Sequence, residues 1–157
     1  ALCMFVPGTV KSQAIDVHIS EFCASNITGP TDNYGEHSDW IEIRSTFSSS
    51  LSLKSYFLSD DINNHFKWQF PEDFVLQPGE VKVVWLTGRN ENTGGQVHAN
   101  FTLNQCGGQE LILSTTQGVI RDRIAVKPTM ADHTRGRRVK QFMPGRWRRA
   151  TRSSGIA

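Results

Sequence analysis

Short stretches of alternating apolar and polar residues recur along the chain, separated by turn-forming residues. Residues 56–86 show this most clearly, with alternating runs on either side of the turn signal Gln77-Pro78-Gly79-Glu80. A period of two predicts half-buried strands, and Pro followed by Gly suits a type II turn. No segment of ten or more residues has a helical period. The predicted strands cover residues 15–22, 39–44, 56–58, 67–70, 81–86, 97–103, 110–114 and 119–126.

This pattern predicts an all-β fold, a sandwich or barrel of about seven to nine strands with a hairpin near its end. The alternation also assigns the large aromatic residues to faces. Trp68, Phe70, Val83 and Trp85 are predicted to share one core. Trp40 alternates away from its apolar neighbours, so it is the candidate for an exposed platform that contacts a ligand such as a sugar.

Three polar residues receive specific expectations from the same alternation. His18 and His98 fall on the polar sides of their predicted strands and are expected to face solvent. Asp122 falls on the apolar side of its strand. A bulge that turns this residue outward is favoured over a buried carboxylate, because burying an unpaired charge is costly.

The charge of the chain is distributed unevenly. The 157 residues carry a net charge of only +2. Eight of the 17 bases lie beyond His133 with no acid among them, which leaves nine bases against 15 acids and a net charge of −6 on the rest. Like charges favour an extended chain, so residues 138–157 are predicted to form a flexible basic tail or linker. Within the tail, Arg146, Trp147, Arg148 and Arg149 are candidates for binding nucleic acid or another polyanion.

The first 14 residues admit two interpretations. They begin with an apolar run, and Ser12-Gln13-Ala14 offers the small residues of a signal-peptidase site. We therefore expect either the remnant of a secretory signal, which predicts a secreted or cell-surface protein, or a disordered leader or edge strand. No apolar run is long enough to cross a membrane.

Cysteine usage leaves the redox state open. Cys23 and Cys106 are an even pair once Cys3 is assigned to the leader. A disulfide between them would add about 2–4 kcal/mol to stability in an oxidising compartment. Two buried free thiols are the favoured alternative.

Acidic residues gather in two loops, where they are weak candidates for calcium ligands. Asp32 and Asp39 lie in one loop, and Asp60 and Asp61 lie in the other. Carboxylates suit calcium, but the spacing matches no EF-hand, and acids in turns normally accept bonds from backbone N–H groups. We therefore expect no metal and no cofactor. No serine-nucleophile, dinucleotide or phosphate-loop signature occurs either, so an enzyme is not expected.

Several motifs occur in an order that resembles the lamin tail domain family in its bacterial form. Together they cover roughly residues 15–137. The motifs are ISEFCASN from Ile19, SDWIEI from Ser38, YFLSDD from Tyr56, KWQFP from Lys67, LQPGE from Leu76, VVW from Val83, HANFTL from His98 and GQELIL from Gly108.

The resemblance implies an immunoglobulin-like β-sandwich for residues 15–137 and a role without catalysis. Bacterial members of the family are secreted or surface modules, often attached to nucleases, other hydrolases or spore-coat-kinase-like domains. In animals the similar domain contacts proteins and chromatin. The main hypothesis is therefore a monomeric interaction or anchoring module that binds a protein, a glycan or an attached enzyme. The alternatives are polyanion binding through the tail and an accessory domain of a larger enzyme.

Overall fold

A computed structural model describes residues 17–136, so the predicted leader and basic tail lie outside the described residues. The prediction of an all-β fold is confirmed, with twelve strands and no helix in this range. The count exceeds the expectation because four strands have only two residues each. The strands are β1 (Val17–Cys23), β2 (Trp40–Ser45), β3 (Leu51–Ser52), β4 (Tyr56–Ser59), β5 (Trp68–Gln69), β6 (Val75–Leu76), β7 (Val81–Trp85), β8 (Glu91–Thr93), β9 (Gln96–His98), β10 (Glu110–Thr115), β11 (Ile120–Ala125) and β12 (Arg135–Gly136).

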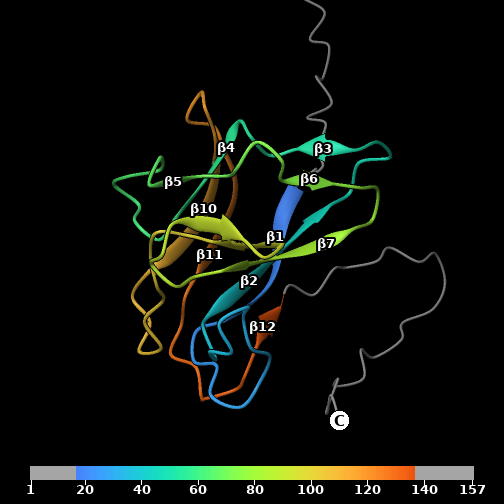
Figure 1. The fold of residues 1–157 in the computed structure, drawn as a ribbon. Helices are drawn as coiled ribbons and strands as arrows, with labels where there is room; N and C mark the ends of the chain where they lie inside the picture. The colour runs from blue at the N-terminus through green and yellow to red at the C-terminus, as the bar shows by residue number, and fades with distance from the viewer. Residues whose placement is uncertain (1–16, 137–157) are drawn as a thin grey trace, which may run out of the picture.

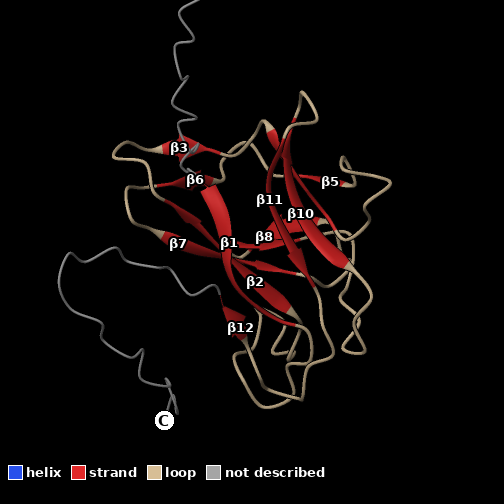
Figure 2. Cartoon of the chain, turned by 180° about the vertical axis from the view of Figure 1, so that it is seen from behind, coloured by secondary structure: helices blue, strands red, loops and turns tan. Residues whose placement is uncertain are grey.

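Two larger sheets form an open sandwich (Figures 1 and 2). One has the strand order β12-β1-β2-β7-β9-β8, and the other has the order β11-β10-β4-β5. A small third sheet pairs β3 with β6. All pairs are antiparallel except β7 with β9. Nothing in the described range forms an apolar helix long enough to cross a membrane.

The core lies between the facing sides of the two larger sheets. Ile41 and Ile43 of β2 are fully buried there, as their alternation predicts. Trp68 and Phe70 also belong to this core, with ring centroids 4.9 Å apart. After His98 the chain leaves β9, so the predicted strand over residues 97–103 is wrong beyond that point. Its apolar residues are still buried, because the irregular chain returns across the core.

The other half of the predicted core is wrong. Val83 and Trp85 share one face of β7, but that face is the outer one. The inward side chains of β7 include Val84, which is fully buried beside Ile41. Val83 is 39% exposed, and Trp85 packs outside the main core. Alternation shows which side chains share a face of the strand, but it does not say which of the two faces packs against the second sheet.

The outer face of the six-stranded sheet carries a second apolar cluster. Cys23, Trp40 and Trp85 are paired directly across β1, β2 and β7, and His98 of β9 completes the row. Trp40 is only 8% exposed, so its prediction as an exposed platform is wrong. We call these four residues the outer row.

The loop before β2 folds over one end of the outer row. The Tyr34 ring lies edge-on to His98, and His98 Nε2 is 2.7 Å from Asn33 Oδ1. His98 is therefore fully buried, and burial lowers its pKa. His18 is also buried, so the expectation that both histidines face solvent is wrong. Alternation places the polar face of a strand in solvent, and this fails where a loop covers that face.

Asp122 is buried as well, which contradicts the expectation that it turns outward. Its strand does take part in a bulge, between Leu113 and Ser114 of the neighbouring β10. Asp122 Oδ2 accepts the N–H of Ile19 at 2.7 Å, where β1 runs beyond the reach of the two-residue β12. The carboxylate thus takes the place of a strand partner and joins the two sheets.

Candidate binding site

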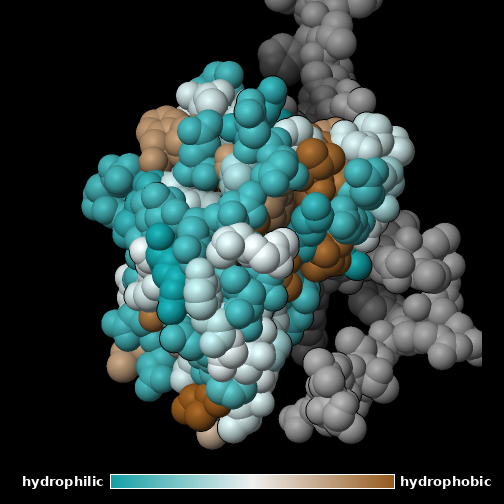
Figure 3. Space-filling model, viewed as in Figure 1, coloured by the Kyte–Doolittle hydropathy of each residue, from teal (hydrophilic) through white to brown (hydrophobic). Residues whose placement is uncertain are grey.

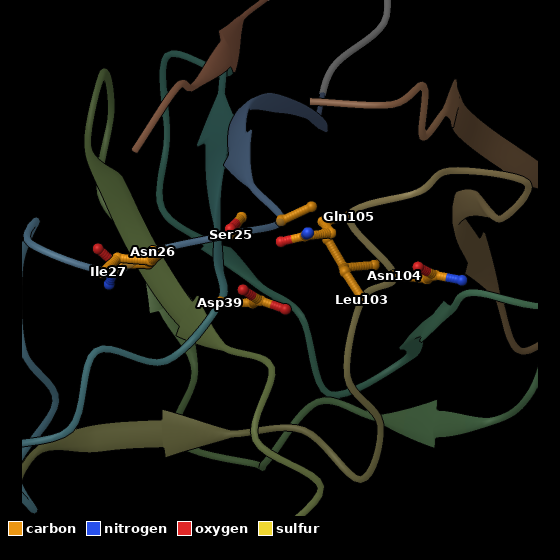
Figure 4. Close-up of a pocket in the computed structure, with 8 residues that line it drawn as sticks. Ser25, Asn26, Ile27, Asp39, Leu103, Asn104 and Gln105 are labelled. Carbon is orange, nitrogen blue, oxygen red and sulfur yellow. The ribbon is translucent and has the colours of Figure 1, made fainter. Parts of the chain in front are cut away.

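A shallow hollow of about 490 Å³ lies at the end of the sandwich where β1 stops and β2 starts. We call it the Asp39 hollow, because Asp39 is its only acidic lining residue. Asp39 lies between the chain that follows β1 on one side and the chain before the 104–107 turn on the other (Figure 4). The lining residues are Ala24, Ser25, Asn26, Ile27, Asp39, Leu103, Asn104 and Gln105.

Asp39 is held by the backbone on three sides. Its carbonyl accepts the N–H of Leu86 at 2.8 Å, which fixes the start of β2 against the end of β7. Its carboxylate accepts the N–H groups of Leu103 and Asn26. Burial nevertheless raises the pKa of this carboxyl above its ordinary value of 3.8, and the two N–H groups offset only part of that effect.

The hollow contains negative charge without a counter-charge. None of the ion pairs among residues 17–136 involves Asp39, and no basic residue lines the hollow. The remaining lining consists of amide, hydroxyl and aliphatic side chains. Such a lining offers acceptor oxygens and one partly desolvated carboxylate, which together suit a cationic group.

The rim of the hollow is fixed by a carboxylate that sequence analysis missed. Asp132 Oδ1 accepts the N–H groups of Ile27 at 2.6 Å and Thr28 at 2.8 Å. Its Oδ2 accepts the Thr28 hydroxyl at 2.8 Å. These three bonds lower the pKa of Asp132 to about 2. The N–H of Asp132 donates to Ser25 O at 2.7 Å, so the 128–133 segment clamps the rim from outside.

Asn26 shapes the same rim from inside. Its Nδ2 donates to Pro30 O at 2.7 Å and to Ser38 O at 2.9 Å, which closes the loop after β1 onto the chain before β2. A Cβ at Gly29 would lie 2.4 Å from Asn26 Oδ1, so a larger residue there would push the Asn26 side chain out of this position. The turn-rich composition of residues 26–38 predicts a loop, but gives no sign of these partners.

The segments that build and clamp the rim carry two exposed apolar side chains. Ile27 is 57% exposed, and Met130 on the clamping segment is 73% exposed. The space-filling view shows an apolar spot at this loop end of the molecule (Figure 3). Charge inside and apolar surface at the mouth are the combination that protein interfaces use around an anchoring residue.

The four acids proposed as calcium ligands have separate structural roles. Asp32 accepts the N–H groups of Tyr34 and Glu36 and the hydroxyl of Ser38, and these bonds lower its pKa against the opposing effect of burial. Asp60 pairs with Lys67. Asp61 accepts the N–H of Asn63 at 2.8 Å. Residues 17–136 contain no group of three side chains that could hold a metal ion, and Asp39 does not join the other acids.

The remaining predicted site residues fall in three places. Trp40 lies in the buried outer row. Cys23 and Cys106 are both free, so no disulfide joins them. Burial raises the pKa of the Cys23 thiol, whereas Cys106 is exposed, contrary to the expectation of two buried thiols. Arg146, Trp147, Arg148 and Arg149 lie outside the described residues.

Fold and hollow together define an immunoglobulin-like β-sandwich whose loops build a small polar site at one end. Residues 11–128 match the Lamin Tail Domain family. The chain therefore belongs to the lamin tail domain family, a non-enzymatic immunoglobulin-like family. The resemblance carried by the sequence motifs is thus confirmed. No curated protein matches the chain.

Proposed function

We propose that this lamin tail domain is a non-catalytic interaction module of a secreted or cell-surface protein. The partner is a protein that inserts a lysine or arginine side chain into the Asp39 hollow. The uncompensated carboxylate of Asp39, set in a hollow whose lining contains no base, is the observation that carries this proposal.

The chemistry of the site favours a protein over a glycan as partner. Burial deprives the Asp39 carboxylate of part of its hydration, and a cation in the hollow would compensate for this loss. Charge-assisted hydrogen bonds are also stronger than neutral ones. The exposed side chain of Ile27, which lines the hollow, suits the apolar flanking residues of a peptide chain. Sugar recognition at the hollow would call for an aromatic platform, and none of its lining residues is aromatic.

A titration with a minimal ligand tests the proposal. The probe is Nα-acetyl-lysine-N-methylamide, with the norleucine derivative as its uncharged match. We expect the lysine probe alone to shift the amide NMR signals of Asn26 and Leu103, whose N–H groups bond to Asp39. Asp39→Asn should weaken the binding at least tenfold, because the charge is lost while an acceptor oxygen remains.

Asp61→Asn is the control variant, since Asp61 is a carboxylate in an exposed turn away from the hollow. It should bind the lysine probe like the unaltered chain. Equal shifts with lysine and norleucine, or undiminished binding by Asp39→Asn, would remove the hollow as a cation site.

The uneven charge of the chain supports a second candidate function. Eight bases without an acid follow His133, and such a segment attracts polyanions without regard to sequence. Deleting residues 138–157 should abolish retention on heparin at low salt if the tail binds polyanions. It should leave binding of the lysine probe unchanged. Equal retention of the full and shortened chains would eliminate the polyanion function.

A further inference from the structure

Two glutamates stand directly opposite each other on the outer face of the six-stranded sheet. The register pairs Glu21 of β1 with Glu42 of β2, and Glu42 with Val83 of β7. These three residues lie two positions along their strands from the outer row, so their side chains share its face. We call Glu21 and Glu42 the acidic pair. Both are half-buried, and Val83 beside them is 39% exposed.

The negative charge of the acidic pair is not balanced by its surroundings. Like charges directly opposite each other on neighbouring strands are destabilising. The Ser20 hydroxyl donates to Glu42 Oε2 at 3.3 Å, and Arg44 on the same face attracts Glu42. The pKa of Glu42 is nevertheless raised, first by burial and then by the charge of Glu21. None of the ion pairs among residues 17–136 involves either glutamate.

The last described strand brings the chain to this face. β12 forms the edge of the six-stranded sheet beside β1 (Figure 2). Gly136 of β12 pairs with Glu21, and a Cβ built on Gly136 would lie 3.8 Å from Glu21 Cγ. A side chain at this position would therefore lie against the acidic pair. The chain that follows β12 thus starts beside two carboxylates.

The sequence after β12 contains the counter-charge that the acidic pair lacks. Seven bases and no acid follow Gly136, and Arg138 and Lys140 come within four residues of it. Four extended residues span up to about 14 Å. Neighbouring strands lie about 4.8 Å apart, so Glu42, two strands away from β12, is within about 10 Å of it. The first bases of the tail can therefore reach both glutamates.

We propose that the tail docks in cis on the outer face of the six-stranded sheet, with Arg138 and Lys140 against the acidic pair. The contact needs neither the Asp39 hollow nor a polyanion, so it goes beyond both proposed functions. The chain's own tail is the occupant because tethering gives it an effective concentration on the order of millimolar, which a free basic peptide would have to match.

Docking of this kind is reversible and has a consequence for polyanion binding. Ion pairs between partly exposed groups are individually weak, and salt screens them. A polyanion that offers more charge than two glutamates competes for the same bases. The acidic pair therefore lowers the affinity of the tail for polyanions, and a polyanion in turn releases the tail from the sheet.

Zero-length cross-linking of the full chain tests the contact. A carbodiimide joins an amine to a carboxylate that touches it, and Lys140 is the only lysine beyond Gly136. We expect links from Lys140 to Glu21 and Glu42 at low salt, mapped by mass spectrometry. They should disappear at about 1 M salt, where the Debye length is about 3 Å. Lys67 and Asp60, whose charged groups are 2.5 Å apart, should link at both salt concentrations and serve as the internal control.

Matched variants separate docking from general attraction between the tail and an acidic domain. Arg138→Gln removes a charge beside the acidic pair and should reduce the Lys140 links several-fold. Arg149→Gln removes the same charge further along the tail and should leave the links unchanged. Glu42→Gln should also reduce the remaining link between Lys140 and Glu21 several-fold, because half of the attracting charge is lost.

The same experiment identifies the occupant. In a mixture of isotope-labelled and unlabelled chain, links within one isotopic form support docking in cis. Links between the two forms would overturn it in favour of a second copy. Absence of Lys140 links while Lys67 links to Asp60 would also overturn the proposal. So would equal yields from Lys140 to the exposed Glu72, or equal losses in Arg138→Gln and Arg149→Gln.

Discussion

The Asp39 hollow and the acidic pair differ in how they present negative charge. Loops build the hollow, where one partly desolvated carboxylate is held by two backbone N–H groups. Strands build the acidic pair, where two half-buried carboxylates stand directly opposite each other. The hollow should therefore select a cation by shape and hydration. The acidic pair should hold the tail by charge alone, which salt screens.

The largest expected effect concerns Trp85, which belongs to the outer row beside the acidic pair. Trp85→Ala should lower the free energy of unfolding by about 3–5 kcal/mol, as for other buried aromatic residues. The measurement is urea unfolding followed by circular dichroism. Val83→Ala, two residues away on the same face, should cost less than about 1 kcal/mol because Val83 is half exposed. Equal losses would mean that the outer face has no separate core.

A smaller loss is expected from Asp122, a carboxylate that already has its donors and so contrasts with Asp39. Asp122→Ala removes the acceptor of the buried Ile19 N–H and should cost about 1–3 kcal/mol. Asp122→Asn keeps an acceptor oxygen and should cost less. Denaturant unfolding of both variants measures the difference. If alanine and asparagine behave alike, the bond between the sheets is not what Asp122 contributes.

Acid should weaken cation binding in the hollow before it loosens the rim. The pKa of Asp39 is raised, so binding of the lysine probe should fade as the pH drops through a value above 3.8. The pKa of Asp132 is lowered to about 2. A lowered pKa contributes stability above the unfolded value, near 4, and that contribution is lost as the pH falls toward 2.

NMR signals of Ile27 and Thr28 should report the second step, because their N–H groups bond to Asp132. Asp132→Asn should remove this pH-dependent change in the signals of Ile27 and Thr28. The loss of lysine binding at low pH should remain. The signal of Ile41, which is fully buried in the core, should not change while the hollow loses its ligand. A simultaneous change at Ile41 would show that acid opens the whole sandwich.

The smallest effect is expected from metal removal. Asp32, Asp60 and Asp61 are occupied by backbone or side-chain donors of the protein itself, so chelation removes nothing that they need. EDTA should leave the melting temperature unchanged, as measured by differential scanning fluorimetry. A fall of many degrees that added calcium reverses would make these loops a metal site.

Much of the framework could be predicted from the sequence because alternation shows which side chains share one face of a strand. The buried isoleucines of β2, the Trp68–Phe70 pair and the β10–β11 hairpin all follow from it. Alternation does not reveal whether a loop covers one face of the sheet, since that depends on residues distant in the chain. Trp40 and His98 were therefore placed wrongly in solvent.

The candidate sites were predictable only in part. Asp39 stood out as an acid in a loop, although its partners Leu103 and Asn26 come from other loops, whose approach no local pattern encodes. Asp132 gave no signal, because its role depends on a contact with Thr28 more than 100 residues away. The acidic pair was invisible, because its two glutamates face each other only through the register of β1 and β2.

The clamp formed by Asp132 has a mechanical consequence. The family match ends at residue 128, yet Asp132 and β12 lie beyond it and hold the rim of the hollow. A force applied to the chain beyond residue 136 acts first on β12, which pairs with β1 through two residues. Once β12 peels away, the same load reaches Asp132 and draws it off Thr28. Tension on a tether attached here would therefore loosen the rim of the hollow.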